Sequence, residues 1–349
     1  MRTEVVRIDS PAQTREIEET GRLLREGGVA AIPTETVYGL AANALDETAV
    51  RKIFAAKGRP QDNPLIVHIS ALAEWAPLVR AIPPEAVALA EAYWPGPLTI
   101  ILEKADCIPD AVSCGLATVA VRMPSHPIAA AIIRASGVPL AAPSANTSGK
   151  PSPTTAAHVL HDLDGRIDRI VDGGTCSVGV ESTVVSLAGS RPRLLRPGGI
   201  TLAQLEAVLG EVDVDRAVLG QAAAGEKVAS PGMKYKHYSP AGDVRLVKGT
   251  AAQFAAFAET FPAETTAVVC FDGEAPRFGR PVFTIGAKDD GAAHAHAIFD
   301  VLRRTEAEGY KDVLIHCPGA DGVDLAVLNR LLRAAEFQVI DLNNEVNIE

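Results

Sequence analysis

The sequence predicts an α/β protein with two domains, the first built on a twisted mixed sheet and the second on a small parallel sheet. Its 349 residues suggest two domains on the usual size range of hydrophobic cores. Aromatic residues make up only 5% of the chain while 47% is hydrophobic, which favours Ala- and Val-rich α/β layers over an aromatic-rich sandwich. Strand-like and helical segments alternate, irregularly up to about residue 210 and regularly after residue 243.

The first part of the chain opens with a helical pattern at residues 12–26, which ends at the capping pair Gly27-Gly28. A short buried strand follows at residues 29–33. Later strands and helices come in irregular order and several strands are amphipathic, so we expect a mixed sheet flanked by helices. The strands are predicted at 65–69, 98–102, 118–121, 139–142 and 183–187, and the helices near 47–56, 83–93, 126–136 and 155–162.

The second half of the chain begins with a change of composition. Residues 210–229 are rich in Ala, Asp and Gly and have weak periodicity, and residues 230–242 read Ser-Pro-Gly-Met-Lys-Tyr-Lys-His-Tyr-Ser-Pro-Ala-Gly. This composition predicts a linker at 211–242 between a first domain at 1–210 and a second at 243–349. The second domain alternates cleanly, which predicts a small parallel sheet with helices on both faces. Its strands are expected at 244–248, 266–271, 282–285, 312–316 and 337–341, and its helices at 250–260, 291–308 and 322–335.

Composition excludes several classes of protein. The net charge of −10 and the absence of basic runs argue against a protein whose main task is to bind nucleic acid. Five cysteines without a Cys-x-x-Cys pair favour neither a disulfide framework nor a zinc site, and the histidines lack metal-ligand spacing. The charged N-terminus does not resemble a signal peptide, and no stretch reaches the roughly 18 apolar residues of a membrane span. We therefore expect a cytoplasmic protein without a membrane partner.

The segment at residues 57–68 carries the densest polar chemistry of the chain. It reads Lys-Gly-Arg-Pro-Gln-Asp-Asn-Pro-Leu-Ile-Val-His, and its two prolines restrict the backbone at and before each of them. We interpret it as a stiff loop that presents Lys57, Arg59 and Asn63 together and then enters the core towards His68. A solvated connector with ordinary surface charges is the alternative when the segment is considered alone.

Polar clusters recur at the ends of the predicted strands, where α/β folds tend to bind ligands. They lie at 34–36, 57–63, 122, 143–146, 179–183 and 196–199. Each cluster alone is usually a turn, but together they favour one site. The cations Lys57, Arg59 and Arg196 suit a polyphosphate, and Arg122 suits a carboxylate. No Walker loop, Gly-x-Gly-x-x-Gly fingerprint or nucleophile elbow is present.

Taken together, these motifs resemble those of the YrdC-like domain of threonylcarbamoyl-AMP synthases. The resemblance covers residues 10–210, and the segment at 230–240 resembles the linker of the long, two-domain form, whose C-terminal domain is a small Rossmann-like unit. The motifs are Pro-Thr-Glu-Thr-Val-Tyr-Gly-Leu at 33–40, Lys-Gly-Arg-Pro at 57–60, Asn-Pro-Leu at 63–65, Pro-Ser-Ala-Asn at 143–146, Glu-Ser-Thr-Val at 181–184 and Arg-Pro-Gly at 196–198.

The resemblance implies a nucleotidyltransferase that joins L-threonine, bicarbonate and ATP into threonylcarbamoyl-AMP and releases pyrophosphate. The product serves tRNA modification through downstream threonylcarbamoyl-transfer proteins, so tRNA is an indirect partner. Lys57 and Arg59 are implied as catalytic residues. The implied threonine contacts are Thr36, His68, Arg122, Ala142 through its backbone, and Ser182. The implied ATP contacts are Arg59, Asn63, Thr118, Ser144, Ser152, Arg196 and a linker tyrosine, for which Tyr238 is favoured over Tyr235.

Three further expectations accompany this function. Mg²⁺ should bridge the ATP phosphates, because it typically uses few protein ligands and keeps its waters, so no residue is assigned to a metal. The linker around 234–238 is expected to close over the nucleotide as a lid. An RNA-binding or ribosome-maturation factor is the alternative function, and carbamoyl transfer is a weaker one because the chain lacks paired Cys-x-x-Cys motifs.

Overall fold

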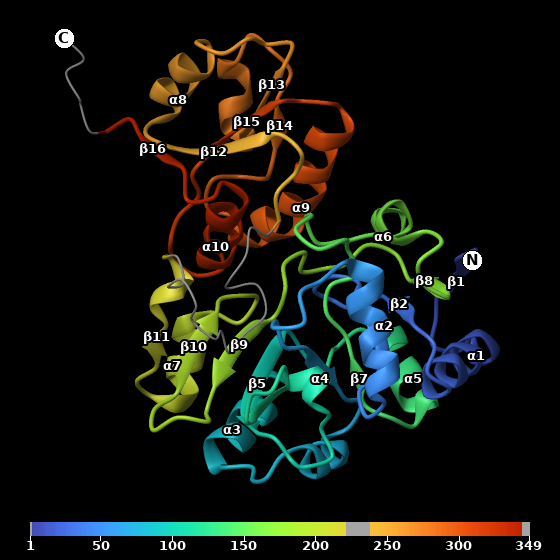
Figure 1. Cartoon of the computed structure of the whole chain (residues 1–349). Helices are drawn as coiled ribbons and strands as arrows, with labels where there is room; N and C mark the ends of the chain where they lie inside the picture. The colour runs from blue at the N-terminus through green and yellow to red at the C-terminus, as the bar shows by residue number, and fades with distance from the viewer. Residues whose placement is uncertain (1, 221–237, 344–349) are drawn as a thin grey trace. The chain divides into compact units, whose positions relative to one another are not determined.

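The computed structural model describes residues 2–220 and 238–343, which fold into two compact units (Figure 1). The first unit comprises Met1–Ser148 and Ser152–Lys234, and the second comprises Gly149–Pro151 and Tyr235–Glu349. The predicted linker at 211–242 lies largely outside the described residues. Each unit has its own sheet and its own buried apolar residues, and each is described separately below.

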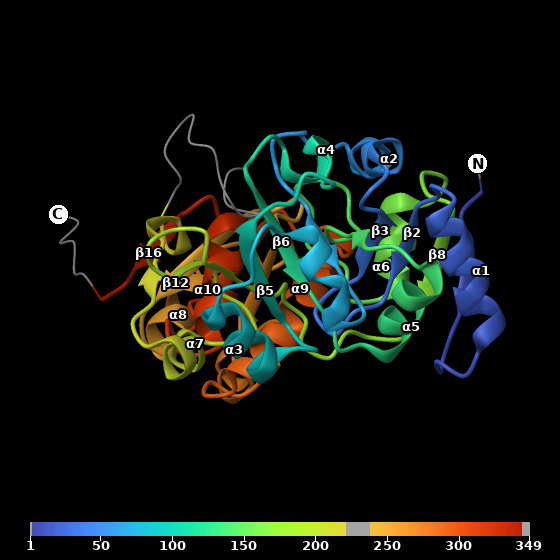
Figure 2. The same cartoon turned by 90° about the horizontal axis from the view of Figure 1, so that it is seen from below.

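The first unit is built on a mixed sheet of eleven strands, in the order β1-β8-β2-β3-β7-β4-β6-β5-β9-β10-β11. The sheet contains parallel pairs such as β4 with β6 and antiparallel pairs such as β5 with β6. Strands β5 and β6 lie side by side in Figure 2. This confirms the predicted mixed sheet. The strands are β1 Glu4–Arg7, β2 Ala30–Ile32, β3 Gly39–Asn43, β4 Ile66–His68, β5 Leu98–Glu103, β6 Thr118–Arg122, β7 Leu140–Ala141, β8 Arg169–Asp172, β9 Thr183–Ser186, β10 Arg193–Arg196 and β11 Asp213–Val214.

The helices of the first unit pack against this sheet with their apolar faces. Helix α1 packs against α5, and Gly21 allows the close approach, because an added Cβ would lie 2.6 Å from the backbone carbon of Ala135. Helix α2 begins at Asp46, whose side chain accepts hydrogen bonds from the next turn, and ends at Gly58 in the left-handed conformation. The helices are α1 Thr14–Arg25, α2 Glu47–Lys57, α3 Pro84–Tyr93, α4 Asp110–Ser113, α5 Pro127–Ser136, α6 Ala156–Leu163 and α7 Leu202–Leu209.

The second unit is a five-stranded sheet in the order β14-β13-β15-β12-β16, and every strand pair in it is parallel. This confirms the predicted small parallel-sheet domain. Its strands are β12 Asp243–Lys248, β13 Thr266–Cys270, β14 Phe283–Thr284, β15 Asp312–His316 and β16 Val339–Asp341, and its helices are α8 Ala251–Ala258, α9 Gly291–Ala307 and α10 Asp324–Ala334.

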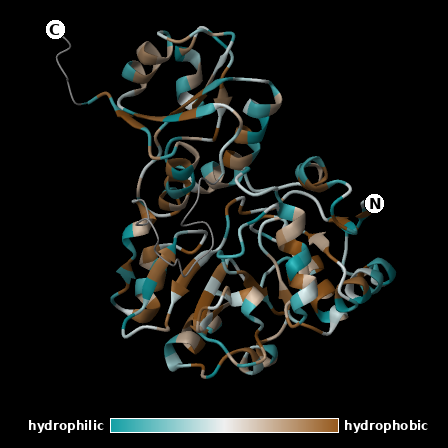
Figure 3. Cartoon of the chain, viewed as in Figure 1, coloured by the Kyte–Doolittle hydropathy of each residue, from teal (hydrophilic) through white to brown (hydrophobic). Residues whose placement is uncertain are grey.

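The hydropathy of the residues follows this layering. In Figure 3 the strands of each sheet are mostly hydrophobic, while helices such as α1 alternate between hydrophobic and hydrophilic segments. Ile17 and Leu24 are the buried side of α1, and its charged residues lie on the other side. Burial of the apolar faces on both sides of each sheet is the main stabilising term of both units.

Candidate active site

The carboxyl ends of β4 and β6 bring together three of the residues predicted to bind threonine. His68 and Arg122 are neighbours in the parallel β4–β6 ladder, so their side chains lie on the same face. Arg122 donates from Nη1 to the Thr36 hydroxyl at 2.9 Å and from Nη2 to the Glu35 carboxylate at 2.7 Å. All four side chains are buried. Thr36, His68 and Arg122 therefore form one polar cluster, the strand-end cluster, together with Glu35.

The charges in this cluster are fixed by burial and by Arg122. Burial raises the pKa of the Glu35 carboxyl, but the charge and hydrogen bond of Arg122 oppose it, and the net pKa is lowered. His68 is held neutral, because burial and then the positive charge of Arg122 lower its pKa to about 3. Its Nδ1 lies 3.1 Å from the Ile66 carbonyl oxygen. The cluster thus presents one cation, one anion and a neutral imidazole at pH 7.

Ser182 joins the strand-end cluster through β5. Thr99 lies opposite Arg122 across β5 and β6, and its hydroxyl is 2.8 Å from the Ser182 hydroxyl. Arg196, predicted to bind ATP, donates to the Ser182 hydroxyl at 3.2 Å and to the Ser182 carbonyl at 3.1 Å. Gly198 permits this approach, because an added Cβ would lie 2.2 Å from the Thr183 nitrogen. Arg196 is therefore hydrogen-bonded to Ser182, which is predicted to bind threonine.

Ala142 lies beside the same strands but its amide is already used. The N–H of Ala142 donates to the carbonyl oxygen of Ile66 at 3.0 Å, next to the β4–β7 pairing. The predicted backbone contact between Ala142 and threonine would therefore have to use the Ala142 carbonyl group.

The opposite ends of β4 and β6 carry residues predicted to bind ATP. Arg59 follows the end of α2 and donates to the carbonyl oxygens of Asn63 at 3.3 Å and Pro64 at 3.4 Å, just before β4. The side-chain oxygen of Asn63 is buried and has no hydrogen-bond partner within the described parts of the chain. Thr118 is the first residue of β6, four positions before Arg122, which corresponds to ~13 Å along a strand. Arg59, Asn63 and Thr118 thus lie at the amino ends of β4 and β6, whereas Arg196, also predicted to bind ATP, lies beside Ser182.

Lys57 fixes a third segment, the loop at residues 143–152. Its ammonium group is buried and donates to the carbonyl oxygens of Ser144 and Asn146. Its own carbonyl accepts a hydrogen bond from the Ser148 amide at 2.9 Å. At the far end of the loop, the buried Ser152 hydroxyl donates to the Glu181 carboxylate. Lys57 is thus placed next to Ser144, and their assignment to one nucleotide site stays a prediction.

Tyr238, also predicted to contact ATP, belongs to the second unit. Its ring is 4% exposed, lies 5.2 Å from the Phe299 ring centroid, and has the Arg330 guanidinium carbon 5.8 Å from its own centroid. Its φ of 65° lies in the left-handed region. Tyr235 and the rest of the predicted lid lie outside the described residues. The assignment of Tyr238 to ATP stays a prediction.

The structure also bears on metals, thiols and membranes. Within residues 2–220 and 238–343, no group of three or more His, Cys, Asp or Glu side chains could hold a metal ion. All five cysteines are free, and burial raises the pKa of the Cys176 thiol to about 12, so this thiol is protonated at neutral pH. No helix in the described part of the chain is long and apolar enough to cross a bilayer.

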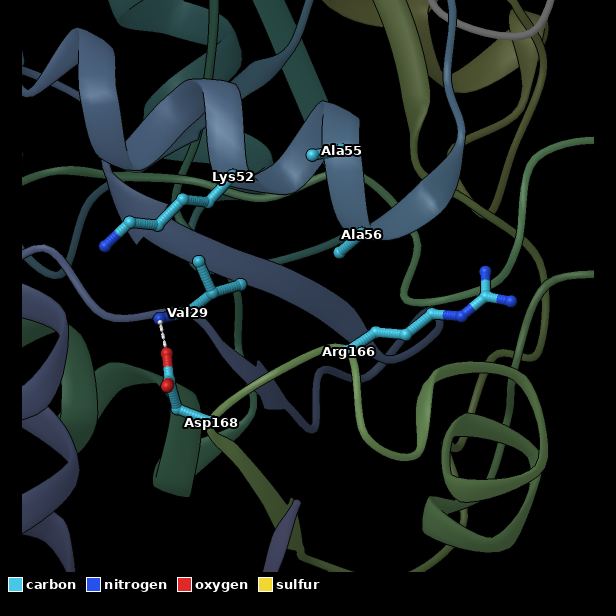
Figure 4. A pocket seen from close by; sticks show the side chains of 6 residues that line it. All are labelled: Val29, Lys52, Ala55, Ala56, Arg166 and Asp168. Atoms are coloured by element: carbon cyan, nitrogen blue, oxygen red, sulfur yellow. Dashed lines mark hydrogen bonds between the residues drawn. The ribbon is translucent and has the colours of Figure 1, made fainter. Parts of the chain in front are cut away.

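A separate hollow of about 600 Å³ lies on the first unit beside α2 (Figure 4). Its charged groups already hold the main chain: the Asp168 carboxylate accepts from the Val29 amide at 2.8 Å, and Lys52 donates to the Gly27 carbonyl at 2.6 Å. It contains none of the residues predicted from the sequence motifs, and we assign no ligand to it. It is lined by Val29, Lys52, Ala55, Ala56, Arg166 and Asp168.

Three contributors to the site were not selected from the sequence. Glu35 pairs with Arg122, Thr99 contacts Ser182, and Glu181 accepts from Ser152. Glu35 and Glu181 stand inside motifs that the sequence highlighted, so their position next to Thr36 and Ser182 was an available signal. Thr99 had no such signal, because it lies inside an apolar strand.

Fold and site together define an α/β protein whose buried cations and hydroxyls suit small anionic ligands. The family model described as "Telomere recombination" matches residues 22–198, and the model described as "Threonylcarbamoyl-AMP synthase, C-terminal domain" matches residues 200–336. The chain belongs to the threonylcarbamoyl-AMP synthase family.

Similar proteins agree over nearly the whole chain. The threonylcarbamoyl-AMP synthase of Bacillus subtilis is 46% identical over 93% of this chain and 94% of its own length. That of Pyrococcus abyssi is 43% identical over 97% of this chain and 99% of its own. Among solved structures, P. abyssi Sua5 complexed with L-threonine matches with a TM-score of 0.88 and 41% identity, covering 98% of this chain and 100% of that one. The two-domain α/β architecture is thereby confirmed.

Proposed function

We propose that this protein is an L-threonylcarbamoyladenylate synthase, which uses L-threonine and ATP together with bicarbonate and releases pyrophosphate. The strand-end cluster is the observation that carries the proposal. It combines a buried arginine, a hydroxyl and a neutral histidine at one point, and the chain aligns over 98% of its length with a protein solved in complex with L-threonine.

The strand-end cluster suits an amino acid. A guanidinium has five N–H donors, and the contacts to Thr36, Glu35 and the Gly96 carbonyl involve one donor on each of its three nitrogens. The two remaining donors fit the carboxylate of threonine. Neutral His68 can accept or donate a hydrogen bond without competing for that carboxylate as a second cation. Ser182 supplies a further hydroxyl for the threonine side chain or amine.

The residues predicted to bind ATP suit a polyphosphate. Lys57, Arg59 and Arg196 supply three cations, and Ser144, Ser152 and Asn63 supply neutral hydrogen-bonding groups. In the reaction we propose, the threonine amine attacks the bicarbonate carbon and a C–O bond breaks with loss of water, which gives a carbamate. A carbamate oxygen then attacks the α-phosphorus of ATP while pyrophosphate leaves. Both steps gather negative charge, so positioning and charge neutralisation by these cations should supply most of the catalysis.

Mg²⁺ belongs to this proposal as a companion of ATP. It would add positive charge to the phosphates while keeping most of its water ligands. We assign no residue to it.

The test is pyrophosphate release from ATP by the full-length protein, with threonine and bicarbonate omitted in turn. We expect release to need both, and mass spectrometry of the complete reaction to find threonylcarbamoyl-AMP. Thr36→Val, which keeps the shape of the side chain but removes its hydroxyl, should weaken the response to threonine. The conservative change Thr48→Val, at an exposed position of α2, is the matched control. Release that ignored threonine would contradict the proposal.

The wider setting is also proposed. A mixed anhydride of threonylcarbamate and AMP is an activated acyl donor, so its product should pass to proteins that acylate an amine, here during threonylcarbamoyladenosine formation in tRNA. Net charge −10 makes direct tRNA binding by this chain less favourable than transfer through such proteins. A cytoplasmic location is supported by the five free cysteines.

A further inference from the structure

One oxygen of the strand-end cluster has no hydrogen-bond partner among the described residues. Glu35 pairs with Arg122 through Oε1, which lies 2.7 Å from Nη2, but its Oε2 is buried and accepts no hydrogen bond from the described parts of the chain. The Glu35 side chain is only 7% exposed, so bulk water has little access to it. A buried polar atom without a partner is costly, and native proteins keep one mainly where a ligand or an ordered water satisfies it.

The main chain holds Glu35 in this position. The Thr34 hydroxyl accepts hydrogen bonds from the amides of Thr36 at 3.2 Å and Val37 at 3.3 Å, which closes a tight turn around Glu35. The carbonyl of Glu35 accepts a hydrogen bond from the Val178 amide at 2.7 Å. The turn and the ion pair together fix the carboxylate before a ligand arrives, so binding at Oε2 requires little reorganisation.

Glu35 stays charged in this environment. Burial raises the pKa of its carboxyl, but the charge and hydrogen bond of Arg122 oppose this, the main-chain amides of Glu35 and Ser125 add to their effect, and the net pKa is lowered. A carboxylate whose pKa is lowered is a weak base. Its free oxygen therefore suits a bound cation better than a proton.

The ion pair of Arg122 and Glu35 has a free edge of each sign. Each nitrogen of the guanidinium uses one donor, on the Gly96 carbonyl, the Thr36 hydroxyl and the Glu35 carboxylate respectively, which leaves two donors for a carboxylate. An α-amino acid carries its ammonium one carbon away from its carboxylate, so a zwitterion matches both edges at once. His68 is neutral, and the ammonium therefore meets no second cation there.

We propose that Glu35 binds the ammonium group of threonine through Oε2 and thereby makes the site specific for α-amino acids. In this role Glu35 is a substrate-binding residue as well as the partner of Arg122. The inference rests on the proposed function for threonine as the ligand. The two alternatives are a water molecule bound to Oε2 and a role limited to orienting Arg122, and the experiment separates all three.

The experiment measures the binding of two ligands by NMR titration, without ATP or bicarbonate. The ligands are L-threonine and (R)-3-hydroxybutanoate, which is threonine without its amine and keeps the carboxylate and the hydroxyl. The full-length variant Glu35→Gln keeps the shape of the side chain and an acceptor for Arg122. Glu47→Gln, at an exposed pair with Arg51 on α2, is the matched control.

Glu35→Gln should affect the two ligands differently. We expect it to raise the Kd of threonine about 10- to 100-fold, because a hydrogen bond between two charged groups is lost, and that of (R)-3-hydroxybutanoate by less than about threefold. Glu47→Gln should change neither Kd. An equal rise for both ligands would mean that Glu35 only orients Arg122, and an unchanged Kd for threonine would mean that Oε2 binds water. Either result would overturn the inference.

A measurement on the wild-type protein tests the inference without any variant. The amine of bound [¹⁵N]threonine should lose its proton about one pH unit or more above the amine of free threonine, because Glu35 stabilises the ammonium form. Nitrogen NMR of the bound ligand follows this change as the pH is raised. A bound amine that titrates at or below the pH of the free amino acid would contradict an ammonium held by Glu35.

Binding and pyrophosphate release separate this inference from the proposed function. Threonine-dependent release with the same KM for threonine in Glu35→Gln and in the wild type would leave the proposed function standing and overturn the role of Glu35. The expected pattern of Kd values without any pyrophosphate release would contradict the proposed function and leave the contact between Glu35 and the amine standing.

Discussion

The two ends of β4 and β6 are built differently. At the carboxyl end, Arg122 binds the side chains of both Thr36 and Glu35, and every member of the strand-end cluster is buried. At the amino end, the Arg59 guanidinium donates to main-chain carbonyls, and the buried amide oxygen of Asn63 has no partner within the described residues. One end is a network of side chains, whereas the other is a loop held mainly through its backbone.

This difference matches the ligands we assign to the two ends. Threonine is small and offers few contacts, so its half-site must be rigid and complete before binding. ATP is large and highly charged and can gain contacts from several separate segments. We therefore expect changes at the carboxyl end to damage both stability and threonine binding, and changes at the amino end to damage mainly ATP binding.

Arg122→Ala should have the largest effect. It would leave the Glu35 carboxylate buried beside His68 without its cation, and removal of one partner of a buried ion pair typically costs ~3–5 kcal/mol. Threonine-dependent pyrophosphate release should be lost as well. Denaturant unfolding and the release assay measure the two effects. Arg80→Ala, at an exposed pair with Asp106, should shift stability by less than about 0.5 kcal/mol. A folded Arg122→Ala variant of unchanged stability would contradict this view of the cluster.

Arg59→Ala and Ser182→Ala should separate the two ends kinetically. Arg59 lies in the loop before β4, so its loss should reduce kcat/KM for ATP by about 10- to 100-fold. Ser182 contacts Thr99 and Arg196 beside the strand-end cluster, so its loss should mainly raise the KM for threonine, by several-fold. Steady-state kinetics with each substrate varied in turn gives both numbers. The opposite ranking would mean that the assigned roles are wrong.

Much of the fold could be predicted from local patterns. The apolar runs at 65–69, 98–102 and 118–121 became β4, β5 and β6, because buried strands leave a continuous hydrophobic signal. Strand β1 was missed, because its four residues, Glu-Val-Val-Arg, are mostly exposed and contain only two apolar side chains. Strand β11, with two residues, is too short for any periodicity. The order of the sheet depends on long-range pairing that no local pattern encodes.

The site was predictable in its residue types but not in its partners. The strand-end position of His68, Arg122 and Ser182 follows from where the apolar runs stop. The ion pair of Arg122 with Glu35 joins residues 87 positions apart, and the contact of Thr99 with Ser182 depends on the register of β5 against β9.

The smallest effect should be a pH dependence that arises from His68 alone. Burial first, and then Arg122, lower its folded pKa to about 3, while the unfolded chain should titrate near the ordinary value of about 6.5. Between these values the unfolded state binds more protons, so His68 makes the protein less stable as the pH falls. From pH 7 to pH 5.5 this contribution amounts to about 1 kcal/mol. Glu35, whose pKa is lowered, loses its contribution only below its unfolded pKa of about 4.3, outside this interval.

His68→Gln isolates this contribution, because glutamine keeps a hydrogen-bonding side chain that does not titrate. Burial lowers the pKa of His294, but its hydrogen bond to Asp324 outweighs this and the net pKa is raised, so His294 makes the protein more stable as the pH falls. His294 is present in both proteins, so its contribution cancels in the comparison. The measurement is the free energy of unfolding of both proteins at pH 5.5 and pH 7. We expect the wild type to lose about 1 kcal/mol more than the variant on acidification. Equal losses would mean that His68 is charged in the folded state, and the strand-end cluster would then present two cations to threonine instead of one.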